Sequence, residues 1–289
     1  MKNTEKKDED LVKIVQPLVD WYRENKRDLP WRHNPDAYRV WISEIMLQQT
    51  RVEAVKGYYD RFLKAFPTVK DLAEAEEDKL LKLWEGLGYY NRVRNMQKAA
   101  QQIMVDHEGI FPDTYEEILQ LKGIGNYTAG AISAFAYGIP KPAVDGNVLR
   151  VISRITGSYE DIMKQSVRKK IENTLEQVIP SDAASDFNQG LIELGAIVCV
   201  PNGEPKCEEC PVKEYCIACK EKLTTEIPVK KKAKTRKIEE RTILIFKDGK
   251  RIAIRKRPAK GLLAGLYEFP NVEGKLSMDE VTEYSKTIG

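Results

Sequence analysis

The sequence predicts a mainly α-helical protein with a short β-rich segment near its C-terminal end. Helix start signals recur at short intervals from residue 10 to about residue 220. No alternating apolar and polar pattern, typical of strands, interrupts this region. After residue 240 the pattern changes to β-rich runs. The length of 289 residues leaves room for one large domain or two smaller ones.

Several segments of the first 220 residues carry local helix signals. The stretch PDAYRVWISEIMLQQTRVEAV, residues 35–55, begins with Pro-Asp, a favourable helix start, and we expect one helix there. Thr68 and Thr114 open the segments TVKD and TYEE, which have the capping-box pattern. The stretch 182–198 follows Pro180 and has apolar residues at helical spacing, so it predicts a further helix.

The C-terminal segment predicts a hairpin and the beginning of a second domain. Two β-rich runs in residues 241–258 flank Asp248-Gly249, a strong signal for a two-residue hairpin turn. A new helix start lies near Met278. About fifty residues are too few for a typical independent α/β domain. We therefore expect the second domain to be cut short, with a linker over residues 221–239.

Composition places the chain among ordinary soluble proteins. Apolar residues make up 42% and charged residues 31%, and the net charge is +3. No apolar run is long enough to span a bilayer, and the start MKNTEKKDED lacks the apolar stretch of a signal peptide. We expect a cytoplasmic protein, associated with the nucleoid if the source is bacterial. Nucleic-acid binding then needs local positive charge, and the basic run 229–241 is equally well explained as a solvated linker.

All five cysteines lie between positions 199 and 219. Thiols stay reduced in the cytoplasm, so clustered cysteines there indicate metal ligands before disulfides. On spacing alone, zinc is a serious candidate, because two Cys-x2-Cys pairs are formed by Cys207, Cys210, Cys216 and Cys219. The only histidines, His33 and His107, lie far away in sequence, and we expect them to be plain surface or core residues.

Residues 119–138, LQLKGIGNYTAGAISAFAYG, have the form of a helix–hairpin–helix. A capped helix runs into Gly123 and Gly125, and a second helix starts near Asn126. The glycines permit a tight turn and close approach of a ligand, and the exposed amides at the helix start favour an anion such as a DNA phosphate. Taken alone, the pattern is equally well explained by a plain helix end followed by a new helix.

Two carboxylates occupy positions that permit chemistry. Asp145 precedes the apolar periodicity of AVDGNVLRVISRI, where capping the helix is the simpler role. Glu44 shares a helix face with Trp41 and Leu47, and a carboxylate on an apolar face is uncommon. Burial raises the pKa of a carboxyl group, so Glu44 can act as a general acid near neutral pH. The alternative is a helix-boundary residue that reaches solvent or an arginine.

In their order and spacing, these segments resemble the helix–hairpin–helix DNA glycosylase superfamily and, within it, the adenine DNA glycosylases of the MutY type. The resemblance covers about residues 15 to 220 and rests on LPWR (29–32), VWISEIMLQQTRV (40–52), WEGLGYYNRVRNM (84–96), LKGIGNYTAGAI (121–132), AVDGNVLRVISR (143–154) and FNQGLIELGAIVC (187–199). The segment GLLAGLYEFP, residues 261–270, is similar to the start of the family's Nudix-like C-terminal domain.

The resemblance implies a fold and a domain organisation. Residues 1–220 would form a two-lobed, all-helical helix–hairpin–helix glycosylase domain with an iron–sulfur loop at 199–219. A basic linker (221–239) and an incomplete α/β Nudix-like lesion-recognition domain (240–289) would follow. The segment LYEFPNVEG lacks the glutamate-rich Nudix box that binds magnesium, so we expect no pyrophosphate hydrolysis.

The resemblance also implies a [4Fe-4S] cluster at the cysteines. The family pattern is Cys-x6-Cys-x2-Cys-x5-Cys, whereas here the first interval holds seven residues. The implied ligands are Cys199, Cys207, Cys210 and Cys216, with Cys219 as an extra thiol and the zinc set as the alternative. The metal group would have a structural role, since it would fix the conformation of a loop whose Lys206 and Lys213 contact DNA phosphates.

The activity implied by the resemblance is removal of adenine mispaired with 8-oxoguanine, or guanine, in duplex DNA. The base must be flipped out of the duplex. Glu44 matches the acid that protonates adenine, and Asp145 matches the carboxylate that stabilises or traps the sugar cation. Tyr127 matches a tyrosine that supports Asp145 by hydrogen bonding. A lysine occupies this position in the endonuclease III-like lyases, so tyrosine predicts a monofunctional glycosylase.

The remaining implied site residues contact DNA. Gln49 and Tyr89, with Thr50 close by, match residues at the lesion, where they fill the gap left by the flipped base. The expected base pocket and backbone contacts comprise Trp31, Arg32, Gln189, Gly123 and Gly125. The expected partner is double-stranded DNA carrying the adenine:8-oxoguanine mispair, bound by a monomer. The alternatives are an endonuclease III-like pyrimidine-lesion glycosylase/lyase and a non-catalytic DNA-binding metal module.

Overall fold

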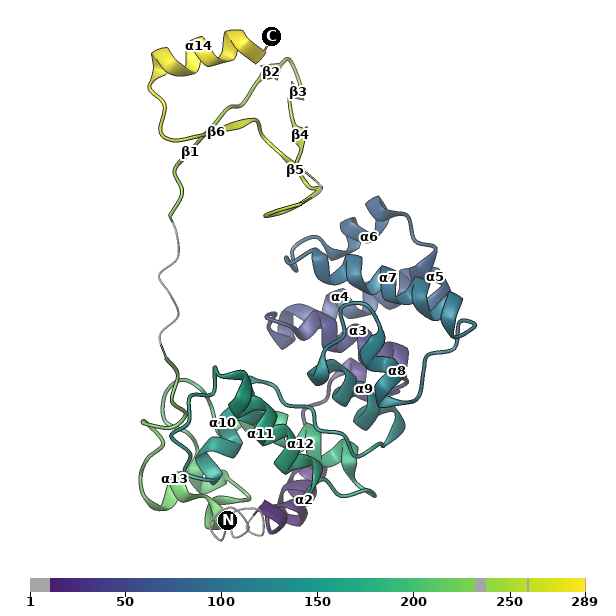
Figure 1. The fold of residues 1–289 in the computed structure, drawn as a ribbon, viewed down its shortest axis with the longest axis vertical. Helices are drawn as coiled ribbons and strands as arrows, with labels where there is room; N and C mark the ends of the chain where they lie inside the picture. Colours follow the sequence, from purple (N-terminus) through teal and green to yellow (C-terminus); the bar gives the residue numbers. More distant parts are fainter. Residues whose placement is uncertain (1–10, 232–237, 259, 289) are drawn as a thin grey trace. The chain divides into compact units, whose positions relative to one another are not determined.

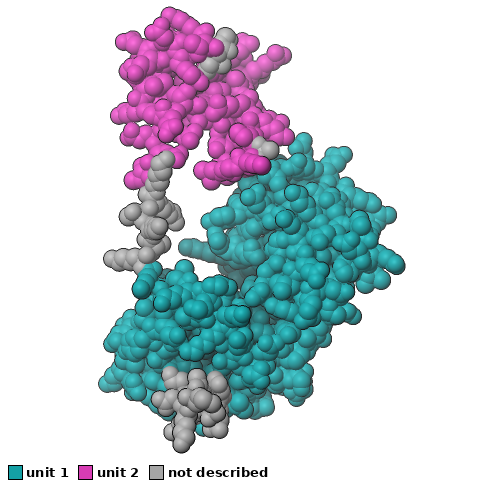
Figure 2. Space-filling model, viewed as in Figure 1, with its two compact units in different colours: residues 1–231 teal, residues 232–289 magenta. Residues whose placement is uncertain are grey.

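The chain divides into two compact units, residues 1–231 and 232–289, which are called the helical unit and the C-terminal unit (Figure 2). The computed structural model describes residues 11–231, 238–258 and 260–288. The division falls inside the expected linker. Residues up to 231 belong to the helical unit, where Ile227 is buried and the Val229 carbonyl accepts a hydrogen bond from the Ile162 amide.

The helical unit confirms the predicted mainly α architecture (Figure 1). No strand occurs between residues 11 and 231, and no helix in the described parts of the chain is long and apolar enough to cross a bilayer. Its elements are α2 (Val15–Asn25), η1 (Pro30–Arg32), α3 (Ala37–Leu47), α4 (Val52–Ala65), α5 (Val69–Ala73), α6 (Glu77–Trp84), α7 (Asn91–Asp106), α8 (Tyr115–Gln120), α9 (Asn126–Tyr137), α10 (Gly146–Ile155), α11 (Gln165–Glu176), α12 (Ala184–Ile197), η2 (Cys207–Glu209), η3 (Lys213–Tyr215) and α13 (Ile217–Lys220).

Apolar side chains of this unit form two separate cores, and these define two lobes. The core of the first lobe draws on residues 29–132, and Trp41, Trp84 and Phe62 are among its large, fully buried side chains. The core of the second lobe combines residues 11–19 of the N-terminal region with residues 144–218. Helix α2 packs against α12, which explains why the N-terminal region joins the second lobe. Helices α9 and α12 pack together and connect the lobes.

The helix predicted over residues 35–55 is wrong in one respect, because it is broken in the middle. Helix α3 ends at Leu47 and α4 begins at Val52. Between them, Gln49 has a φ of 59°, a left-handed conformation that cannot continue a right-handed helix. The sequence there has no glycine or proline to announce the break. The carbonyls freed at the end of α3 are bound instead by Arg92, from α7.

The predicted helix–hairpin–helix is confirmed, and its two glycines have different backbone conformations and surroundings. Helices α8 and α9 are joined by residues 121–125. Gly123 has a φ of 81°, and a Cβ there would lie 2.7 Å from the Cβ of Asn95, so the turn itself requires glycine. Gly125 has an ordinary φ of −114° and caps α9. A Cβ on Gly125 would meet nothing within 4 Å, so its glycine keeps the exposed hairpin surface open.

The capping predictions are confirmed to different extents. At Thr68 the box is complete, since the hydroxyl accepts from the Asp71 amide and the Asp71 carboxylate accepts from the Thr68 amide. At Thr114 the hydroxyl accepts from the Glu117 amide. The Glu117 carboxylate, however, binds the Thr114 hydroxyl rather than its amide, so the box there is only half formed.

The C-terminal unit contains short strand pairs and one helix. Strand β1 (Arg241–Ile243) pairs antiparallel with β6 (Asn271–Glu273), β2 (Lys247–Asp248) with β3 (Arg251–Ile252), and β4 (Arg255–Lys256) with β5 (Tyr267–Glu268). The predicted hairpin is present, with its turn at Gly249-Lys250, one residue later than predicted, because Asp248 pairs with Arg251. Helix α14 (Met278–Ile288) starts as predicted. Only Leu244 and Asn271 are buried among the described residues of this unit, so these residues form no core of their own.

Candidate active site

A cavity of about 740 Å³ in the helical unit is lined by residues of both lobes. Its wall includes η1, the face of α3, the 48–52 segment, the start of α9, the start of α10 and one face of α12. The structure brings most of the predicted site residues together on this wall: Trp31, Arg32, Glu44, Gln49, Thr50, Tyr127, Asp145 and Gln189. Tyr89, Gly123 and Gly125 lie outside it, on exposed surface.

Glu44 projects from α3 into this cavity, and only 6% of the residue is exposed. Burial raises the pKa of its carboxyl group from 4.5 to about 7, and the nearby charge of Asp145 adds to this effect. The hydrogen bond from Tyr127 and the positive charge of Arg32 act in the opposite direction. The predicted burial is therefore confirmed, and burial shifts the pKa in the expected direction. A carboxyl group of this kind can carry a proton near neutral pH and release it to a bound base.

Tyr127 binds a different carboxylate from the one expected. Its hydroxyl donates a hydrogen bond of 2.5 Å to Oε2 of Glu44, so the prediction that it supports Asp145 directly is wrong. The physical reason is packing, since Tyr127 lies in the first turn of α9 and α9 packs along α3, which carries Glu44. Burial and the neighbouring carboxylates raise the pKa of Tyr127 well above its usual value. The phenol therefore stays protonated and serves as a donor.

Asp145 is held by the N-terminus of α10. Its Oδ1 accepts 2.8 Å hydrogen bonds from the backbone amides of Asn147 and Val148, and its Oδ2 accepts a 2.7 Å bond from Nδ2 of Asn147. The helix-capping role considered from the sequence is thus present, and the same carboxylate lines the cavity. Burial raises the pKa of Asp145, whereas these donors act against that rise. The arrangement orients a carboxylate toward any positive charge that develops in the cavity.

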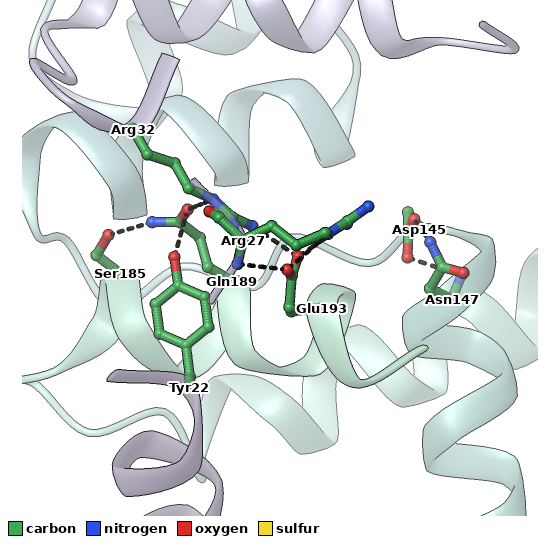
Figure 3. A network of polar contacts seen from close by, with 8 residues as sticks. All are labelled: Tyr22, Arg27, Arg32, Asp145, Asn147, Ser185, Gln189 and Glu193. Atoms are coloured by element: carbon green, nitrogen blue, oxygen red, sulfur yellow. Dashed lines mark hydrogen bonds and ion pairs between the residues drawn. The ribbon is translucent and has the colours of Figure 1, made fainter. Parts of the chain in front are cut away.

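A polar network forms the wall contributed by α12 (Figure 3). The side chain of Glu193 is fully buried and accepts from Nε of Arg27 at 2.7 Å and from Nη2 of Arg32 at 2.8 Å. Burial alone would raise the pKa of Glu193, but the bonds from both arginines outweigh it and lower the pKa to about 2. Gln189 accepts from Nε of Arg32 at 3.1 Å and from the Tyr22 hydroxyl at 2.8 Å.

Sequence reasoning missed Arg27 and Glu193 as members of this wall. Glu193 carried the same signal as Glu44, because it falls among the apolar positions of the helix 182–198. Arg27 precedes the LPWR segment and has no comparable local signal. Both arginines bind the buried carboxylate of Glu193, and these mutual contacts favour one arrangement of the wall.

The five cysteine side chains gather around a second, small cavity of about 20 Å³, together with Arg154, Lys206 and Lys213. Cys216 is buried and the others are partly exposed. Within residues 11–231, 238–258 and 260–288, no three or more His, Cys, Asp or Glu side chains adopt a metal-binding arrangement. The chemistry of the donors nevertheless fits an all-thiolate metal group, because several thiols converge and Nη1 of Arg154 donates to Sγ of Cys199 at 3.2 Å.

Helix α10 links this cysteine loop to the main cavity. Asn147, which donates to Asp145, accepts a 2.8 Å hydrogen bond from Nη2 of Arg150. Nε of Arg150 in turn donates to the Cys199 carbonyl at 2.8 Å. One turn further, Nη1 of Arg154 donates to Sγ of Cys199 and to the Val200 carbonyl, each at 3.2 Å. The helix whose start orients Asp145 thus anchors the cysteine loop through both arginines.

Comparison with known proteins identifies the family of this chain. Residues 42–179 match the HhH-GPD superfamily of base excision DNA repair proteins. An adenine DNA glycosylase of Buchnera aphidicola subsp. Acyrthosiphon pisum is 39% identical over 90% of this chain and 74% of its own length. The adenine DNA glycosylase of Homo sapiens is 34% identical over 88% of this chain and 56% of its own length.

Solved structures show the same helical architecture. A thermostable thymine-DNA glycosylase is similar with a TM-score of 0.66 and 30% identity, over 75% of this chain and 99% of its own. Endonuclease III, in a non-covalent complex with DNA, is similar with a TM-score of 0.63 and 22% identity, over 75% of this chain and 98% of its own. At this identity, the similarity establishes a shared fold and no shared activity.

The helix–hairpin–helix, the cavity with its carboxylates and these matches define a DNA glycosylase of base excision repair. Within that class, the chain belongs to the adenine DNA glycosylase family.

Proposed function

We propose that this protein removes adenine mispaired with 8-oxoguanine or guanine from duplex DNA, by hydrolysing the N-glycosidic bond without cutting the strand. One observation supports this chemistry: Glu44 and Asp145 line the same cavity, and the pKa of Glu44 is raised to about 7. Family membership supports adenine as the base and duplex DNA as the partner.

The first step is protonation of the leaving group. Adenine flipped from the duplex enters the 740 Å³ cavity, which has ample room for one base. Glu44 transfers its proton to a ring nitrogen of adenine while Tyr127 holds its carboxyl group in place. The bond between C1′ and the base nitrogen then breaks, and its electron pair leaves with neutral adenine.

The second step is capture of the sugar cation. Asp145 stabilises the oxocarbenium ion electrostatically, or bonds to it until water arrives. Water adds to C1′ and gives its proton to the Glu44 carboxylate, which restores the acid for the next turnover. The backbone amides that bind Asp145 fix its position, so little reorganisation is needed as charge develops.

The absence of lyase chemistry in this proposal rests on Tyr127. A lyase needs an amine nucleophile at the sugar. The Tyr127 phenol donates to Glu44 and stays protonated, and no lysine occurs among the described residues that line the cavity. These observations disfavour the pyrimidine-lesion glycosylase/lyase. The pair of carboxylates disfavours a non-catalytic binding module.

The proposal extends to the DNA contacts and the partners. Gln49, Thr50 and Tyr89 act at the lesion, and the exposed glycines of the 121–125 hairpin meet a phosphate. The C-terminal unit belongs to a Nudix-like lesion-recognition domain. The protein binds the duplex as a monomer, in the cytoplasm or on the nucleoid, where its substrate is.

The cofactor in this proposal is a [4Fe-4S] cluster on Cys199, Cys207, Cys210 and Cys216. When bound, the cluster would hold the cysteine loop in one conformation, and α10 anchors the same loop through its arginines. Zinc on the other ligand set, with Cys219 in place of Cys199, is the alternative. Iron and acid-labile sulfide assays on protein purified without oxygen distinguish them, since zinc without sulfide would exclude the cluster.

A labelled duplex with adenine opposite 8-oxoguanine tests the activity, with half of each sample quenched neutrally and half in hot alkali. Cleavage only after alkali is the expected result, because an abasic site breaks in alkali. Cleavage under the neutral quench would instead indicate an amine nucleophile. Binding without cleavage in either half would contradict the proposed hydrolysis.

A further inference from the structure

Arg92, at the start of α7, connects two loops of the first lobe. Its Nη1 donates to carbonyls at the end of α3, and its Nη2 donates to carbonyls of the loop that precedes α7 and to a hydroxyl of the 48–51 loop. The acceptors of Nη1 are Ile45 (2.8 Å), Met46 (3.2 Å) and Gln48 (2.5 Å), and those of Nη2 are Leu87 (3.0 Å), Gly88 (3.3 Å) and the Thr50 hydroxyl (3.4 Å).

Both loops contain a residue in the left-handed backbone region. Gln49 has a φ of 59° and Tyr89 a φ of 48°, conformations that non-glycine residues rarely adopt and that surrounding contacts must hold. Acceptors of Arg92 flank Gln49 on both sides and immediately precede Tyr89. The guanidinium also lies 5.5 Å from the ring centroid of Tyr89.

The chemistry of this contact needs arginine. A guanidinium presents several donors in one rigid plane, whereas a lysine ammonium is a single point that cannot reach both loops. Among the described residues, the hydrogen-bond partners of Arg92 are neutral backbone carbonyls and one hydroxyl, and none is a carboxylate. Desolvation accordingly lowers the pKa of Arg92. A simple cap of α3 would use Nη1 alone.

We propose that Arg92 is a positioning residue that fixes the loops 48–51 and 85–90 as one unit, so that Gln49 and Tyr89 enter the duplex together. This inference rests on the proposed function, which places both side chains at the lesion. Tyr89 is 63% exposed and available for such a contact. Loss of the connection leaves each loop able to touch DNA but removes their fixed relative geometry.

Hydrogen exchange of the free protein tests the connection without reference to activity. Arg92→Lys and Arg92→Gln are compared with Arg94→Lys, two positions further along α7, where Nε of Arg94 binds Glu77 at 2.9 Å. We expect faster amide exchange in both residues 48–51 and 87–90 in the Arg92 variants, by about 10-fold, and no change there in the control. Faster exchange in 48–51 alone would reduce Arg92 to a helix cap and overturn the inference.

A kinetic cycle tests the consequence for the reaction. In the wild type, the losses of single-turnover excision rate caused by Gln49→Ala and Tyr89→Ala are expected to be non-additive, because the loops act as one unit. In the Arg92→Lys background, the rate losses caused by Gln49→Ala and Tyr89→Ala are expected to be additive. Arg92→Lys by itself should slow excision by about 100-fold. Duplex affinity and the thermal midpoint change little, which a general loss of structure would not allow.

The outcomes separate this inference from the proposed function. Identical coupling between Gln49 and Tyr89 in both backgrounds would overturn the role of Arg92 while leaving adenine excision intact. A wild-type protein that excises no adenine would refute the proposed function, and the exchange experiment would still decide whether Arg92 joins the loops. The use of both lysine and glutamine variants keeps the test decisive if one of them fails to fold.

Discussion

Glu44 and Asp145 reach the same cavity from the two lobes, and each lobe surrounds its carboxyl group differently. In the first lobe, Glu44 is buried on α3, and its carboxyl group accepts a hydrogen bond from the Tyr127 hydroxyl. In the second lobe, Asp145 sits at a helix N-terminus with three donor contacts, from the amides of Asn147 and Val148 and the Asn147 side chain. Burial raises the pKa of both groups, so burial alone does not distinguish them.

The difference lies in the donors that oppose burial. A carboxylate that accepts several N–H bonds at a helix start is stabilised as an anion. A carboxyl group with one phenol donor is stabilised much less, and its pKa reaches about 7. The negative charge of Asp145 raises the pKa of Glu44 further. In the proposed reaction, Glu44 of the first lobe therefore donates the proton and Asp145 of the second lobe stabilises the cation, as in glycoside hydrolysis generally.

The largest effect is expected from Glu44→Gln. It removes the proton donor with little change in shape, so single-turnover excision should fall by about 10² to 10⁴-fold while duplex binding is retained. Glu53→Gln on α4 is the matched control, since Glu53 is exposed and forms a surface ion pair with Lys56 at 2.8 Å. Unchanged excision by Glu44→Gln would remove Glu44 from its role as the acid.

Asp145→Asn tests the second lobe. Asparagine remains a good N-cap and can still accept from the backbone amides, but it removes the negative charge. Excision should fall by about 10² to 10³-fold with the thermal midpoint nearly unchanged. Asp145→Ala, which also removes the cap, should lower the unfolding free energy by about 1 kcal/mol. Intact excision by Asp145→Asn, with the stability loss confined to Asp145→Ala, would mean that Asp145 only caps α10.

The pKa of Glu44 also predicts how stability depends on pH. The folded carboxyl group titrates near 7 and the unfolded one near 4.5, so the folded protein binds the extra proton between these values. This contribution is fully present below pH 4.5 and is lost as pH rises through 7, a loss of about 3 kcal/mol. Urea unfolding at pH 5 and pH 8 should show that the wild type loses more stability than Glu44→Gln does. Equal losses would mean that Glu44 has an ordinary pKa.

The sequence was sufficient for features that depend on local pattern. The helix–hairpin–helix follows from Gly123 and its flanking periodicity, and the burial of Glu44 follows from its apolar neighbours on one helix face. The break after Leu47 was not predictable, because the group that stabilises it, Arg92, lies 44 residues after Gln48 in the chain. Local propensity favoured a continuous helix there, and the tertiary hydrogen bonds override it.

The partner of Tyr127 was equally beyond the sequence. The sequence predicted its position at the start of α9. Which carboxylate it binds depends on how α9 packs against α3. The wall of Arg27 and Glu193 shows the same limit, since a buried carboxylate can be recognised from helix periodicity while its arginine partners cannot. Long-range side-chain pairs are set by the arrangement of the helices, which the periodicity of each helix does not specify.

Tyr127→Phe gives the smallest effect and tests the comparison most directly, because it removes the phenol donor from Glu44. The hydrogen bond lowers the pKa of Glu44, so its loss should move the alkaline fall of the excision rate to higher pH. The lost bond should also cost about 1 kcal/mol of unfolding free energy when Glu44 is neutral, and more above pH 8, where the buried carboxylate lacks its donor.

The measurement is a single-turnover pH profile together with urea unfolding at pH 6 and pH 8. Tyr137→Phe is the control, since the Tyr137 hydroxyl donates to the Phe111 carbonyl, at the other end of the same helix. A pH profile that stays in place, or that moves to lower pH, would show that Tyr127 does not set the protonation of Glu44. Burial and the charges of Asp145 and Arg32 would then set the pKa of Glu44 without a hydrogen-bond contribution, and the contrast with the helix start that holds Asp145 would be greater still.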